Sequence, residues 1–310
     1  MTKRNFILFP IPFLLLLMLF VQPAQAQKHH DKNNDYNEMA PGDEVEPGVD
    51  FIIGAGIYFG SKKTAGYYSG IPDNENNVNY IFENYSWHKQ ILEEIAANNN
   101  HFSINDTTLR IGDYPLNIAY KPAMSITLGA SYRFDKHWRI SIYYSFARLV
   151  ASNFFTLTFD GTLGNLNDNI INCPIVGKEN RSFFDLTGSY TFQVHKIVKP
   201  YIEFGAQFNF VRVKSFETKI YDREFNLLDI YGGNTYVQGV DMQEIDKKYG
   251  GPGFAVMAST GIKFAFSKAV SIDPCFYISF GKIGLEGYKD FHFNYGAYVR
   301  LVMSDAMFSK

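Results

Sequence analysis

The segment GIKFAFSKAVSIDPCFYISFG, residues 261–281, decides how this chain folds. Apolar residues occupy every second position on both sides of a break at Ser267 and Lys268, and small, polar or charged residues fill the positions between them. An alternation with a period of two predicts two β-strands, and the short break predicts a hairpin turn. One face of the hairpin is apolar and the other is polar, so the fold depends on which face meets the solvent and on whether that solvent is water or lipid.

The first 26 residues have the features of a secretory signal peptide. Lys3 and Arg4 form a positively charged start, residues 6–21 are apolar, and the sequence AQA at 24–26 is a small-residue cleavage site. The apolar run is shorter than the roughly 20 residues of a membrane-spanning helix, which argues against an uncleaved anchor. We therefore expect residues 1–26 to be removed as a signal peptide and the rest of the chain to be exported.

The composition of the full chain favours a membrane barrel over a helical membrane protein. Mean hydropathy is only -0.15, but an alternating strand averages to a polar value even when one of its faces is entirely apolar. Aromatic residues make up 17% of the chain, which suits strands and interfacial girdles. The net charge of -2 gives no basic surface for nucleic acid.

We expect a flexible periplasmic leader at 27–48, a barrel at 49–303 and a C-terminal tail at 304–310. The sequence predicts eight antiparallel strands. They are 51–60, 126–134, 138–149, 182–194, 200–213, the two strands of the opening hairpin up to 266 and at 270–281, and 291–303. The strand ends within 108–125 and 150–165 stay open, and residues 160–180 are expected to form a loop.

The predicted connections alternate between short and long, as they do in outer-membrane barrels with short periplasmic turns and long extracellular loops. The two long polar loops are 61–114 and 218–252. Within the first, Trp87, Ile91 and Ile95 recur at helical spacing and predict one short amphipathic helix.

The apolar face of the predicted strands is too rich in rings to fill an eight-stranded barrel, whose interior is only wide enough for modest side chains. The rings can instead cover its outside if that outside is lipid. The lipid-facing set includes Phe264, Phe266, Ile272, Phe276, Phe293 and Tyr295. A soluble, lipocalin-like barrel with the apolar face inward is the alternative.

Four segments carry a resemblance to known proteins. They are ITLGASYRFDKHWRISIYYSF (126–146), LTGSYTFQVHKIVKPYIEFGAQFNF (186–210), STGIKFAFSKAVSIDPCFYISF (259–280) and FHFNYGAYVRLVM (291–303). In pattern the chain resembles small outer-membrane β-barrel proteins of Gram-negative bacteria of the OmpX and OmpA type, and is similar to the PorT-like outer-membrane β-barrel domain family. The resemblance implies an eight-stranded transmembrane barrel in the outer membrane, and a PorT-like relationship would imply an accessory role in protein secretion.

The polar face also carries charges, which we expect to form a network in one layer of the lumen. Its members are Arg133, Arg139, Asp185, Glu203, Lys263, Asp273 and Arg300. Lys263 and Asp273 are expected to pair across their turn, and the two arginines Arg133 and Arg139 are expected to need Glu203 or Asp185 beside them. The network either plugs the barrel or forms a charged constriction.

No catalytic, metal or cofactor site is predicted. His101, Ser103 and Asp106, with His88 nearby, match no catalytic motif. Cys173 and Cys275 either pair or remain isolated thiols.

The sequence favours a monomeric, non-enzymatic barrel that acts in envelope integrity or in surface interaction through its long loops. A secretion accessory and a narrow pore are the alternatives. The expected partners are membrane lipid and another envelope protein or surface ligand, which the sequence does not identify.

Overall fold

A computed structural model describes residues 47–74, 76–98, 109–159, 170–195, 197–228, 250–267, 269–288 and 290–305. The chain divides into two compact units, Met1–Asp43 and Glu44–Lys310, and all the described residues belong to the second. The predicted signal peptide and most of the predicted leader lie outside the described residues. In the described part, no helix reaches the length and hydropathy of a membrane-crossing segment.

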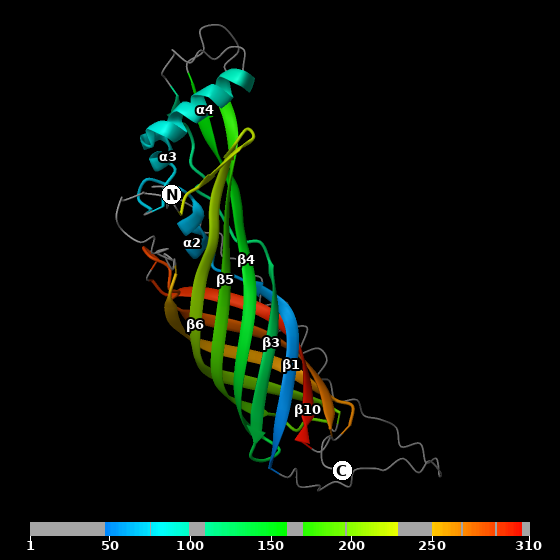
Figure 1. Ribbon diagram of the computed structural model, residues 1–310. Coiled ribbons are helices and arrows are strands. Elements are labelled where there is room, and N and C mark those ends of the chain that lie inside the picture. Colours follow the sequence, from blue (N-terminus) through cyan, green and yellow to red (C-terminus); the bar gives the residue numbers. More distant parts are fainter. Residues whose placement is uncertain are drawn as a thin grey trace, which may run out of the picture. The chain divides into compact units, whose positions relative to one another are not determined.

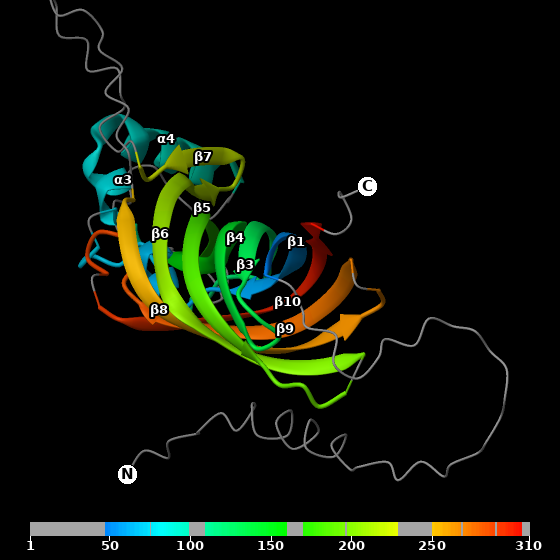
Figure 2. The same cartoon turned by 90° about the horizontal axis from the view of Figure 1, so that it is seen from below.

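Eight long antiparallel strands form a closed ring, as the sequence predicts. They are β1 (Gly48–Phe59), β3 (Ala123–Arg133), β4 (Trp138–Thr158), β5 (Ile170–Thr191), β6 (Val198–Ile220), β8 (Pro252–Ala265), β9 (Val270–Gly281) and β10 (His292–Ser304). Their order around the ring is β4-β3-β1-β10-β9-β8-β6-β5, and pairing between β4 and β5 closes it. Figure 2 follows these strands around the ring from below.

The three tight turns all lie at one end of the ring, and a side chain stabilises each turn by accepting a hydrogen bond from its backbone. Asp135 Oδ1 accepts hydrogen bonds from the backbone N–H groups of His137 and Trp138, at 2.6 and 2.7 Å. These bonds favour the carboxylate and lower the pKa of Asp135. Ser267 Oγ accepts a backbone hydrogen bond from Val270 at 3.1 Å in the opening hairpin, and His195 Nδ1 accepts one from Ile197 at 3.3 Å.

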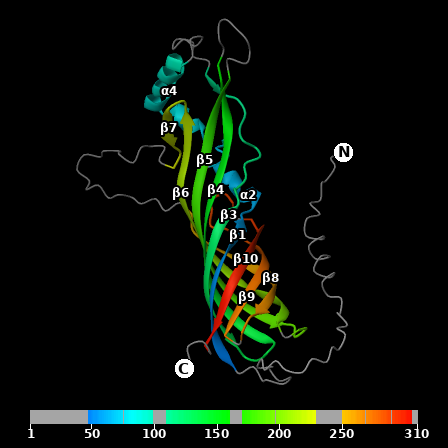
Figure 3. The same cartoon turned by 90° about the vertical axis from the view of Figure 1, so that its right-hand side faces the viewer.

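Strands β4, β5 and β6 continue well past the other five and carry an outer cap (Figures 1 and 3). The cap contains α2 (Lys62–Ala65), the 3-10 helix η1 (Gly66–Tyr68), α3 (Asn79–Glu83), α4 (Tyr85–Asn98), β2 (Arg110–Ile111) and β7 (Arg223–Asn226). The predicted amphipathic helix is therefore present as α4. Its Ile91 and Ile95 are fully buried, and the Trp87 ring lies 5.6 Å from that of Phe225.

The expected loop at 160–180 is wrong from Ile170 onward, because β5 begins there. The strand pairs with β4 from Thr158↔Ile170 down to Trp138↔Tyr190. The expected loop at 218–252 is also shorter, since β6 runs to Ile220 and turns into β7. These extensions bury apolar residues against the helices, and burial in the cap explains why strands persist where no barrel needs them.

The two faces of the ring differ as the alternation predicts. The outward side chains of all eight strands form an exposed apolar belt, with Phe293 60% and Val256 64% exposed. The inward side chains are small, polar or charged, and are mostly buried. The alternative of a water-soluble barrel, in which the aromatic side chains would point inward, is therefore wrong.

Candidate functional site

The lowest group of lumen charges, nearest the tight turns, is organised by Asp50 of β1. Arg133 Nη1 lies 3.1 Å from Asp50 Oδ1, and Arg139 Nη2 lies 3.4 Å from Asp50 Oδ2. The two arginines face each other across the β3–β4 hairpin, which is the register expected from the sequence. The expected acid is wrong: the buried carboxylate of Asp50, and neither Glu203 nor Asp185, separates the two like charges.

A second group crosses the middle of the lumen. Arg300 Nη1 of β10 donates to Glu203 Oε2 of β6 at 2.8 Å, and its guanidinium lies 4.3 Å from the centre of the Tyr143 ring. Thr187 and Ser259 donate to the same carboxylate at 2.6 and 2.7 Å. Glu203 is therefore a buried anion whose lone pairs are satisfied from three strands, which is the condition for tolerating it.

Asp185 lies in this middle region but bonds to different residues. Gln207 Nε2 donates to Asp185 Oδ1 at 2.7 Å and to the Tyr277 hydroxyl oxygen at 2.9 Å. Asp185 and Arg300 line one small cavity, and Arg300 also lines a second one with other predicted charges, so the two groups adjoin each other in the lumen.

Lys263 and Asp273 share the lumen near the lower group. Asp273 faces Arg300 in the β9–β10 register and accepts a hydrogen bond from Ser271 Oγ at 2.9 Å. No ion pair within 4.0 Å joins Lys263 to Asp273, although both are described residues, so the expected direct pair is wrong. Both instead line a small cavity with Arg139, Glu203 and Arg300.

A third group, which the sequence prediction missed, closes the end of the lumen opposite the tight turns. Arg181 Nε donates to Glu179 Oε1 at 2.5 Å, and both side chains are fully buried. The Tyr68 and Tyr120 hydroxyls donate to Glu179 Oε2 at 2.7 and 3.1 Å, while Arg181 Nη1 donates to the Tyr58 hydroxyl oxygen at 3.1 Å. Burial beside the Glu179 carboxylate raises the pKa of Tyr68.

Gly177 is required for this closure. A Cβ atom at Gly177 would overlap the ring of Tyr68, so the missing side chain on β5 makes room for the tyrosine from η1. Tyr68 contacts the Phe216 ring edge-on at 5.4 Å, which joins the closure to the apolar core of the cap. The cap is consequently a seal over the barrel mouth.

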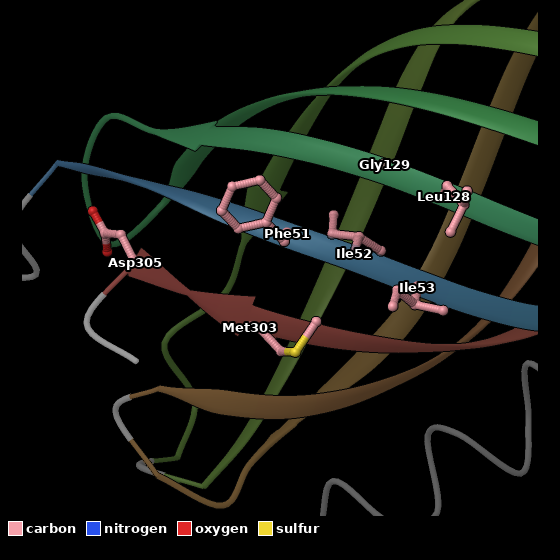
Figure 4. Close-up of a pocket in the computed structure, with 7 residues that line it drawn as sticks. All are labelled: Phe51, Ile52, Ile53, Leu128, Gly129, Met303 and Asp305. Carbon is pink, nitrogen blue, oxygen red and sulfur yellow. The ribbon is translucent and has the colours of Figure 1, made fainter. Parts of the chain in front are cut away.

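The described side chains fill the interior of the ring. Two cavities lie between the charge groups, and each has a volume of about 10 Å³, close to the minimum for a single water molecule. A depression of about 690 Å³ lies on the outer face instead, across β1, β3 and β10 (Figure 4). Phe51, Ile53, Leu128 and Met303 line this depression, so it belongs to the apolar belt.

The predicted lipid-facing residues lie on the outside of the ring. Phe266, Ile272, Phe276, Phe293 and Tyr295 are exposed, and Phe264 is half-buried beside the turn. Aromatic contacts mark both edges of the belt. At the turn end, Trp138 lies 5.1 Å from Tyr190, and at the other end Phe280 lies 4.5 Å from Phe293.

The catalytic candidates His101, Ser103 and Asp106 lie outside the described residues, and the His88 ring bonds to the carbonyl of Phe82 at 3.1 Å. Among the residues that are described, no group of three or more His, Cys, Asp or Glu side chains is placed to hold a metal. Cys173 and Cys275 are separate, buried free thiols.

Asp50, Glu179 and Arg181 are the important lumen residues that the prediction missed. Asp50 shares the inward parity of Gly54 and Gly56 on the first strand, and this parity would have identified it. Glu179 and Arg181 share the parity of Asp185, but Glu179 fell in the predicted loop at 160–180 and Arg181 fell just before the predicted strand at 182–194.

No protein-family model and no curated protein matches the chain. Among solved structures it is similar to Neisserial surface protein A (NspA), at 9% identity over 82% of this chain and 95% of that one, with a TM-score of 0.39. It is also similar to the outer membrane protein OprG of Pseudomonas aeruginosa (8% identity; 83% and 94% covered; TM-score 0.33). A further match is the outer membrane protease OmpT of Escherichia coli (7% identity; 84% and 97% covered; TM-score 0.29). Similarity this low assigns neither a family nor an activity.

Proposed function

We propose that the protein is an integral outer-membrane barrel that acts without catalysis, through its outer cap, in envelope integrity or surface interaction. The observation that carries this proposal is the inverted polarity of the ring, whose exposed outside is apolar and whose buried inside is charged. In water, a continuous exposed apolar belt of this extent would promote aggregation. In a bilayer the same belt is the favourable surface, and a closed ring leaves no unpaired strand edge within it.

The height of the belt supports this environment. The outward residues from Trp138 to Phe146 on β4 span eight steps, or about 27 Å along the strand. At a tilt of about 40° this corresponds to about 21 Å, close to the roughly 25 Å apolar band of outer-membrane barrels. The aromatic contacts at its two edges resemble the girdles that such barrels place at the two interfaces.

The filled lumen favours an interaction role over a narrow pore. Buried charge pairs occupy the interior in three groups: Arg139–Asp50 and Arg300–Glu203 each join two different strands, whereas Arg181–Glu179 lies within β5 and is bonded to Tyr68 of the seal. A permanent path for ions would require several of these buried pairs to separate at once, and breaking one leaves an unpaired buried charge.

The cap supports a role at the surface because it is a folded platform with its own apolar core. Arg223 Nε of β7 donates to Glu94 Oε2 of α4 at 2.9 Å and joins the sheet to the helix across the outside of that core. A partner at the cap would therefore meet a preformed surface, which lowers the entropic cost of binding. The segments proposed for contact remain 61–114 and 218–252.

The test is to extract the protein from outer membranes, compare its gel mobility before and after boiling, and measure the conductance of the same sample in planar bilayers. The proposal expects a heat-dependent mobility shift with no steady conductance. A stable conductance would establish a pore instead, and a soluble protein with no shift would overturn the membrane assignment. A secretion accessory remains a proposal from the resemblance alone, and co-purification of export components with the intact protein is its test.

A further inference from the structure

The apolar belt ends abruptly in positive charge on one side of the ring. On β4, β5 and β6 the last outward belt row is Phe146, Ser182 and Phe210, and these residues face one another in register. The next outward row is Arg148, Asn180 and Arg212, and these are also register partners. Lys178 and Lys214 follow on the same outer face, and Lys121 lies beside β4, where its N–H donates to Val150. We name these five cations, Lys121, Arg148, Lys178, Arg212 and Lys214, the outer cationic patch.

All five residues of the patch are exposed. None of the five has an ion pair or a side-chain hydrogen bond with another described residue. The nearest acidic residue on the outer face of these strands is Glu217. It lies on β6 two positions after Ser215, the residue paired with Lys178. Adjacent strands lie about 4.8 Å apart, so Arg148 and Arg212 are separated by about 10 Å across Asn180. Two long, exposed arginine side chains at this spacing can both contact one external anion placed between them.

The patch has no equivalent elsewhere around the described part of the ring. Beyond β9 and before β10, Lys282 is accompanied by Glu286 and Asp290, and its ammonium lies 5.2 Å from the centre of the Phe291 ring. At the tight-turn end, Lys136 is adjacent to Asp135. On the outward faces of the described strands, the excess of positive charge therefore lies in the β4–β6 sector, at the edge of the belt where the long connections begin.

We propose that the outer cationic patch binds the phosphate groups of membrane lipid at the outer-leaflet interface. This inference rests on the proposed insertion of the belt in the membrane. Guanidinium and ammonium groups are the preferred partners of phosphate, and Arg148 and Arg212 are each able to offer two parallel donors. Phe146 and Phe210 of the belt lie on the same outer face, two residues before Arg148 and Arg212. A lipid whose acyl chain packs on the belt therefore places its phosphate at the level of these arginines.

The test compares two double variants of the intact protein that lose the same charge. R148Q/R212Q removes the centre of the patch, and K63Q/K136Q removes two exposed lysines outside it. Native mass spectrometry in neutral detergent would give the affinities for short-chain phosphatidic acid, for phosphatidylcholine with the same chains, and for inorganic phosphate. A heat-dependent mobility shift must be present in each variant, and its loss from the wild-type protein would overturn the proposed function itself.

We expect the wild-type protein to bind phosphatidic acid at least tenfold more tightly than phosphatidylcholine. The R148Q/R212Q variant should bind phosphatidic acid about thirtyfold more weakly, because each basic residue usually contributes about 1 kcal/mol at an anionic lipid surface. The K63Q/K136Q control should change less than twofold. Equal binding of the two lipids, or an equal loss in both variants, would overturn the inference. Displacement of phosphatidic acid by an equal concentration of inorganic phosphate would also overturn it, by showing that the patch takes a soluble anion.

Discussion

Arg300 of β10 and Glu203 of β6 form a 2.8 Å ion pair, although β9 and β8 lie between their strands in the ring. The pair therefore crosses the lumen and is not a contact between neighbouring strands. The Tyr143 hydroxyl on β4 accepts a hydrogen bond from the same arginine at 3.1 Å, which brings a third side of the ring into the contact. Side chains in the lumen thus connect strands that no backbone hydrogen bond connects.

The first prediction follows from this pair. Substitution of Glu203 by Gln leaves Arg300 as an uncompensated buried charge and should lower the free energy of unfolding by about 3–5 kcal/mol. Urea unfolding in detergent, followed by the heat-dependent mobility shift, measures it. The matched control is E93Q, which removes an exposed pair with Lys89 at 3.9 Å and should change stability by less than about 1 kcal/mol. If the two variants are equally stable, the lumen pair is not a structural element.

The ring could be predicted from the sequence because its strands obey one rule along their whole length. Every second residue from Ile126 to Phe134, and from Ile272 to Phe280, faces outward and is apolar. The alternation alone therefore identifies which face of each strand points outward. The closed ring of eight strands and the tight turns at Asp135 and Ser267 follow from this parity and from turn chemistry.

The cap and the partners within the lumen could not be predicted in the same way. Residues 170–180 include Asn172, Pro174 and Gly177, which read as a loop, but burial of Ile175 under the helices keeps them in a strand. The choice of Asp50 over Glu203 as the partner of Arg133 depends on strand tilt and on neighbours around the ring. Parity gives the face of a residue but not its height or its partner across the lumen.

The second prediction concerns Asp50. Its substitution by Asn removes the charge between Arg133 and Arg139 and should destabilise the barrel by about 1–3 kcal/mol, because two partly buried cations are left facing each other without their shared acceptor. Substitution of Arg139 by Gln in the same chain should restore part of that loss. A double-mutant cycle in urea gives the coupling between the two sites. Strictly additive effects of D50N and R139Q would contradict the role assigned to Asp50.

The third prediction concerns the seal at the mouth. Substitution of Gly177 by Ala forces the Tyr68 ring out of its position and should cost about 1–3 kcal/mol by overpacking. A displaced η1 should expose the preceding helix, so trypsin cleavage at Lys62 and Lys63 should become faster in the variant. The matched control is G188A, since a Cβ at Gly188 meets nothing within 4 Å. Equal cleavage of the two variants would rule out the closure by Tyr68.

The fourth prediction uses the two free thiols as reporters of the cap and the barrel. Burial raises the pKa of Cys173 to about 12, so its thiol is neutral and protected in the folded protein at pH 8. Because the folded pKa lies above the unfolded value of about 8.5, this thiol lowers stability progressively as pH rises from about 8.5 towards 12.

Substitution of Ile95 by Ala creates a cavity in the core of the cap and should cost about 2–5 kcal/mol there. Alkylation at pH 8, located by peptide mapping, should then increase at Cys173 and remain slow at Cys275, which faces the lumen between β8 and β10. In the control variant K89A, which changes the exposed face of α4, alkylation of both thiols should stay slow. Simultaneous labelling of both thiols in the Ile95 variant would mean that the cap and the barrel unfold as one unit, and the cap would then not be an independent platform above the barrel.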